Sequence, residues 1–133
     1  MAQLDVVEVG RVEEFPAGAC RIVNVHGREI GVINSRGRFY AVLNYCPHRG
    51  GPVCAGRLGG TMMPTEPGTL EYAMEGQVLQ CPWHGWEFNI ETGETMFSIS
   101  RSRLKTYPVS VQDGHVRLRI ARGEDESSRD VRV

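Results

Sequence analysis

The sequence predicts an all-β fold, and three observations support this. Short runs rich in branched and aromatic residues recur between turn-forming residues. In the run 115–120, apolar side chains alternate with arginines, which is the period of a strand with one buried face. Helical periodicity is almost absent, and the best candidate is a single helical turn within residues 9–15.

Seven runs are expected as strands, in the order 21–25, 29–34, 39–43, 76–80, 86–90, 107–111 and 115–120. Glycine-containing turns separate the first three runs, which favours an antiparallel meander. A turn at Asp113-Gly114 joins the last two. The segment 56–76 contains five glycines, two prolines and three methionines, so we expect a long loop or a loose hairpin there.

Length and composition favour one globular domain. The chain has 133 residues, of which 41% are hydrophobic and 23% charged. We expect a single domain over residues 1–120, followed by a charged, flexible tail over residues 121–133. The net charge of −1 gives no field that would recruit nucleic acid or a membrane surface. No run approaches the roughly 20 apolar residues of a membrane span. The first residues do not resemble a signal peptide, so we expect a cytoplasmic protein. The oligomeric state does not follow from the sequence.

The four cysteines are Cys20, Cys46, Cys54 and Cys81. An even number permits two disulfides, but without an export signal we expect reduced thiols. Cys20 alternates with Ile22 in a predicted strand, so we expect a thiol buried in the core. For Cys54 we also expect a role in core packing. Cys46 and Cys81 differ from these two because histidines lie close to them in the sequence.

Two short boxes carry the metal-binding chemistry. One residue separates Cys46 from His48, and two residues separate Cys81 from His84. Both boxes closely follow a predicted strand, which places them on loops. A zinc site of two cysteines and two histidines is possible on ligand number, although zinc motifs usually group the cysteines together. One cysteine and one histidine in each box suit a [2Fe–2S] cluster with two different irons, one held by thiolates and one by imidazoles.

The boxes resemble the ligand boxes of Rieske [2Fe–2S] proteins, above all the Rieske-type ferredoxins. The matching segments are Cys46-Pro47-His48 and Cys81-Pro82-Trp83-His84-Gly85-Trp86-Glu87-Phe88. The resemblance covers roughly residues 4–120. It implies one cluster, with Cys46 and Cys81 on the inner iron and His48 and His84 on the outer iron. It also implies an antiparallel β-sandwich base carrying a two-loop cluster-binding subdomain, about residues 44–90, with an insertion at about 56–76.

This chain departs from the family pattern in several places. Respiratory Rieske proteins have a further cysteine in each box, and the two form a disulfide; Gly51 and Trp83 stand at those positions here. Trp86 replaces a serine that donates a hydrogen bond toward the cluster, so we expect a potential at the low end of the Rieske range, about −150 mV. Residues 96–103 replace a proline-containing loop. The insertion could cover one side of the cluster, form a docking surface or be a tolerated addition.

The function implied by this resemblance is that of a soluble one-electron carrier between a reductase and a terminal oxygenase or similar acceptor. Two alternatives are a small Rieske subunit of a multicomponent oxidoreductase and a zinc-stabilised binding module. Independent catalysis is not expected. An oxygenase iron needs two histidines and a carboxylate, and only His26 and His115 remain after the ligands are assigned. No catalytic residue is therefore expected.

Overall fold

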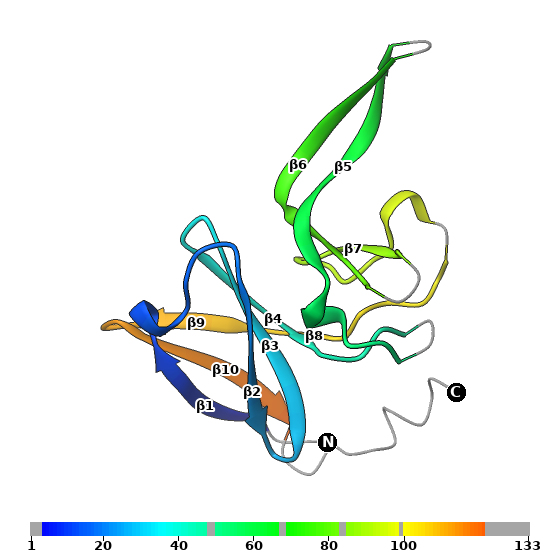
Figure 1. Ribbon diagram of the computed structural model, residues 1–133. Helices are drawn as coiled ribbons and strands as arrows, with labels where there is room; N and C mark the ends of the chain where they lie inside the picture. Colours follow the sequence, from blue (N-terminus) through cyan, green and yellow to red (C-terminus); the bar gives the residue numbers. More distant parts are fainter. Residues whose placement is uncertain (1–3, 48–49, 67–68, 83–84, 99, 122–133) are drawn as a thin grey trace.

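The computed structural model describes residues 4–47, 50–66, 69–82, 85–98 and 100–121 (Figure 1). These residues form three antiparallel sheets and three single-turn 3-10 helices, with no α-helix among them, so the predicted all-β class is confirmed. No helix in the described part of the chain is long and apolar enough to cross a membrane. Apart from Ala121, the expected tail lies outside the described residues.

Two sheets build the base of the molecule. The first contains β2 (Cys20–Val25), β3 (Arg28–Ser35), β4 (Arg38–Leu43) and β8 (Thr106–Tyr107) in that order. The second has the order β1 (Leu4–Arg11), β10 (His115–Ala121) and β9 (Val109–Gln112). The antiparallel pairing of β2, β3 and β4 confirms the expected meander.

Three hairpins of the base turn in the same way. The turns between β2 and β3, between β3 and β4, and between β9 and β10 each have two central residues with positive φ. The second of these residues is glycine in every case, preceded by His26, Arg36 or Asp113. Paired positive φ values are the mark of the type I′ turn, whose twist matches that of the flanking strands.

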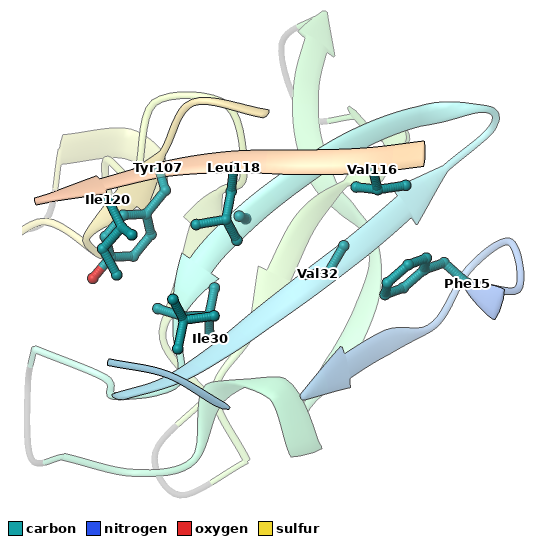
Figure 2. Packing of buried hydrophobic residues seen from close by; sticks show 9 residues of the cluster. Phe15, Ile30, Val32, Tyr107, Val116, Leu118 and Ile120 are labelled. Atoms are coloured by element: carbon teal, nitrogen blue, oxygen red, sulfur yellow. The ribbon is translucent and has the colours of Figure 1, made fainter. Parts of the chain in front are cut away.

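The base buries its core between its two sheets. Val116, Leu118 and Ile120 of β10 are at most 1% exposed and point toward β3, where Ile30 and Val32 are fully buried (Figure 2). The predicted alternation in the last strand is therefore confirmed. At the N-terminus the expected helical turn is only partly correct: a 3-10 helix, η1 (Val12–Glu14), follows the strand β1, which the sequence pattern did not predict.

The third sheet carries the insertion. Its strands are β5 (Arg57–Glu66), β6 (Thr69–Gln80) and β7 (Glu87–Asn89). The expected loop or loose hairpin is thus a long, regular hairpin of β5 and β6. Figure 1 shows the outer half of this hairpin standing clear of β7 and of the base.

Candidate metal centre

The two boxes fold into loops of the same construction. In the first loop, the N–H of Cys46 donates to the carbonyl of Gly51 at 2.8 Å, and the N–H of Gly50 donates to the carbonyl of Cys46 at 2.7 Å. In the second loop, the N–H of Cys81 donates to the carbonyl of Trp86 at 2.8 Å, and the N–H of Gly85 donates to the carbonyl of Cys81 at 3.0 Å. Each cysteine therefore both donates and accepts a hydrogen bond that closes its own loop.

The shared loop geometry follows from a shared sequence pattern. Each loop reads Cys-Pro, then two residues, then Gly. Gly50 has φ 80° and Gly85 has φ 74°, a left-handed conformation that residues with a β-carbon rarely adopt. The prolines directly after Cys46 and Cys81 restrict the backbone between each cysteine and its glycine. The two loops therefore have the same backbone hydrogen bonds at their cysteine and the same left-handed conformation at their glycine, and each holds one cysteine.

Cys46 and Cys81 meet the first requirement of a thiolate-ligated iron site. Each is 2% exposed, and neither is in a disulfide. Both belong to one apolar cluster, whose buried members are Ile33, Val42, Cys46, Val53, Leu79, Cys81, Phe88, Ile90 and Leu104. Two buried thiols that share one core, one from each loop, suit a pair of sulfur ligands to a single iron. The other two expected ligands, His48 and His84, lie outside the described residues.

A close backbone contact joins the segment after the first loop to the second loop. The 3-10 helix η2 (Val53–Ala55) ends at Gly56, which lies against Gln80 at the end of β6. A β-carbon at Gly56 would lie 1.7 Å from the carbonyl oxygen of Gln80 and 3.1 Å from Cδ of Pro82. Only glycine permits this approach, although its φ of −84° is open to any residue. Sequence reasoning missed this contact.

Polar and aromatic contacts hold the strand that leaves the second loop. The Gln80 amide donates to the carbonyl of Gly85 at 3.3 Å, and the Thr61 hydroxyl donates to the Glu87 carboxylate at 2.7 Å. Trp86 is half-buried, packs against the core around Cys46 and Cys81, and lies 6.3 Å from Phe88 between ring centroids. These contacts connect β5, β6 and β7 around the loop.

The loop that follows β7 has its own internal support. The Thr95 hydroxyl donates to the carbonyl of Ser100 at 3.0 Å and accepts from its N–H at 3.3 Å. Between these two residues, the 3-10 helix η3 (Met96–Ser98) turns at Phe97, which has φ 62° and is 56% exposed. The aromatic ring of Phe97 is therefore presented to the outside and does not join the core.

The expectation of reduced thiols is wrong for Cys20 and Cys54, although Cys54 is buried as expected. The two form a disulfide with a Cα–Cα distance of 5.5 Å, across 34 residues of sequence. Cys20 is half-buried at the start of β2 and is not a core thiol. The sequence offered one signal, an even number of cysteines, which did not say which cysteines pair. The pairing depends on η2 lying over β2 and β3, which no local pattern indicates.

The comparison with protein families decides the class of the site. The family model described as Rieske [2Fe-2S] domain matches residues 5–108. The chain belongs to this family. It therefore carries a Rieske-type [2Fe–2S] cluster. The expected fold, a β-sandwich base with a two-loop subdomain, is confirmed as well.

Two of the relatives of this Rieske protein are ferredoxin components of dioxygenase systems. It is 26% identical over 114 residues to the ferredoxin component of the naphthalene 1,2-dioxygenase/salicylate 5-hydroxylase systems of Ralstonia sp, covering 86% of this chain and 94% of the relative. It is 29% identical over 121 residues to the 3-phenylpropionate/cinnamic acid dioxygenase ferredoxin subunit of Photorhabdus laumondii, covering 91% and 97%. These names agree with the expectation of an electron carrier rather than a separate enzyme.

A solved structure shares the architecture. In the complex of reduced oxygenase and oxidized ferredoxin in carbazole 1,9a-dioxygenase, one chain superimposes with a TM-score of 0.68 at 25% sequence identity. The match covers 90% of this chain and 97% of that chain. In that system, therefore, a protein of this fold forms a complex with an oxygenase.

Proposed function

We propose that this chain is the ferredoxin component of a multicomponent oxygenase system. It takes one electron at a time from a reductase and passes it to a terminal oxygenase. The observation that carries the proposal is the pair of twin loops, each with a buried cysteine outside any disulfide, in a Rieske domain whose relatives are ferredoxin components.

In this proposal the ligands are Cys46, His48, Cys81 and His84. The two thiolates bind one iron and the two imidazoles bind the other. The bound cluster supplies a one-electron redox site. Burial of Cys46 and Cys81 keeps water from the sulfur ligands, and the hydrogen bonds within each loop hold the cysteines in place before metal arrives. Preorganised loops reduce the reorganisation that accompanies each electron transfer.

The proposal also includes the chain's organisation and setting. One Rieske domain spans residues 1–120, its cluster-binding part covers about residues 44–90, and residues 121–133 form a flexible tail. The protein works in the cytoplasm with redox proteins as partners. The exposed ring of Phe97 and the exposed Arg101, both in the segment that follows β7, offer contacts to such partners.

A coupled redox and turnover experiment tests the proposed function. The purified holoprotein is titrated with dithionite, and one electron per chain is expected to be taken up at a negative potential, about −150 mV. With dithionite as the only partner, no oxidation of naphthalene is expected. When the reduced protein is mixed with the oxygenase of a naphthalene dioxygenase system, its cluster is expected to reoxidise faster than in air alone.

Two results would contradict the proposal. One is hydroxylation of naphthalene by the isolated chain, which would make it an enzyme in its own right. The other is a reduction potential above zero. Such a value would mean that the missing serine hydrogen bond at Trp86 does not lower the potential, and it would disfavour electron transfer from the cluster to an oxygenase.

A further inference from the structure

The disulfide between Cys20 and Cys54 connects the base to the segment that follows the first cluster-binding loop. Cys20 starts β2, an edge strand of its sheet. Cys54 lies in η2, eight positions after Cys46 in the sequence. The bond therefore crosses from the base to the cluster-binding subdomain.

The surface beneath this disulfide is shaped to hold it. Gly31 of β3 lies under both sulfur atoms, and a β-carbon there would lie 2.6 Å from Sγ of Cys20 and 2.9 Å from Sγ of Cys54. Gly31 does not have the positive φ that would otherwise explain a glycine. The space left by its missing side chain is therefore occupied by the two bonded sulfurs.

On its other side, η2 contacts the cluster-binding core. Val53 is fully buried in the apolar cluster that contains Cys46 and Cys81, and Gly56 touches the backbone at Gln80. The N–H of Cys54 donates to the Asn44 side chain at 2.7 Å, so one polar contact to the first loop's entry is independent of the disulfide. A displacement of η2 is thus transmitted to both loops.

We propose that Cys20 and Cys54 form a reversible thiol–disulfide tie that sets how firmly the two loops retain the cluster. An external dithiol, of small-molecule or protein type, breaks the S–S bond. It delivers two electrons and two protons, leaving two thiols, and is itself oxidised to a disulfide. The unbonded sulfurs then separate to van der Waals contact over Gly31, and η2 is held only by its polar and packing contacts.

The chemical setting favours a regulatory role. Disulfides in reducing compartments are mostly transient, catalytic or redox-sensing. Cys20 is half-buried on an edge strand, so a dithiol can reach it. Cys46 and Cys81, in contrast, are 2% exposed and are proposed as iron ligands. The chain therefore divides its four cysteines into a ligand pair and a redox-responsive pair.

The unmutated holoprotein provides the main test. Oxidised and dithiol-treated samples are alkylated, and the labelled cysteines are mapped by mass spectrometry. The two samples are expected to differ only in the alkylation of Cys20 and Cys54, which are labelled after treatment with the dithiol. Each sample is then challenged with an iron chelator, and cluster loss is followed by visible absorbance. The reduced form is expected to lose its cluster about tenfold faster than the oxidised form.

The double variant Cys20→Ser/Cys54→Ser is the matched control. It is expected to lose its cluster at the fast rate whether or not the dithiol is present, which excludes direct removal of iron by the dithiol. Equal rates of cluster loss for the oxidised and reduced wild type would overturn the inference. So would free thiols at both positions after treatment of the folded holoprotein with an oxidant. Failure of the proposed function is distinguishable, because it would appear in the redox titration and the naphthalene assay and would leave the two rates of cluster loss unchanged.

Discussion

Replacement of Cys81 by serine is expected to abolish the [2Fe–2S] cluster, and the same is expected for Cys46. Each residue is 2% exposed on a loop closed by its own backbone hydrogen bonds, and the other two cysteines are bonded to each other, so no other thiol is placed to replace it. A serine hydroxyl remains protonated at neutral pH and is a poor ligand for an iron–sulfur cluster. Iron and sulfide content per chain, with the visible spectrum, measures the loss, and iron is expected to fall from two per chain to nearly none.

Single serine variants of Cys20 and Cys54 are the controls for this prediction. Each of these variants also replaces a cysteine sulfur by a hydroxyl oxygen, but it leaves the proposed ligands in place. As purified, both variants are expected to keep the red-brown colour and two irons per chain. If Cys20→Ser bleaches the protein and Cys81→Ser does not, the proposed ligand assignment is wrong.

The substitution Gly56→Ala is expected to destabilise the protein strongly. Its β-carbon would lie 1.7 Å from the carbonyl oxygen of Gln80, so η2 and the start of the second loop must move apart. Because the neighbouring atom is backbone, no flexible side chain can yield. Overpacking of this kind costs about 3 kcal/mol in the free energy of unfolding. Urea denaturation measures this cost, and chelator challenge is expected to show faster cluster loss.

Gly27→Ala separates the contact at Gly56 from a general effect of alanine. Gly27 lies in a hairpin turn of the base with φ 80° and has no atom within 4 Å of the added carbon. Its cost is therefore that of a left-handed conformation, about 1–2 kcal/mol. Cluster loss from this variant is expected to match the wild type. Wild-type stability in Gly56→Ala would show that the two loops do not depend on this contact.

Much of the base could be predicted from the sequence because its strands have clear local signals. Alternation of apolar residues and arginines identified β10, and glycine turns separated β2, β3 and β4. The strand β1 was missed because it pairs only with β10, and Val6 is 58% exposed. An edge strand with an exposed valine has no clean alternation, and part of it fell within the residues 9–15 that were expected to form a helical turn.

At the candidate site, the sequence was informative about ligand type and loop position but not about tertiary pairing. The spacing of cysteine and histidine in each box points to the cluster chemistry without reference to the fold. The Cys20–Cys54 bond and the contact of Gly56 with Gln80 instead join segments far apart in the chain. Such contacts depend on how η2 packs between the base and β6, which residue spacing alone does not encode.

The most direct test of the central claim is pulsed electron paramagnetic resonance on the dithionite-reduced protein. Reduction by one electron gives a paramagnetic [2Fe–2S] cluster, and nitrogen ligands leave hyperfine couplings on its signal. We expect couplings from two imidazole nitrogens, and we expect the His48→Cys and His84→Cys variants to lose one coupling each or to lose the cluster. A signal with no nitrogen coupling, or a colourless protein that contains zinc in place of iron, would contradict a Rieske cluster held by these two loops.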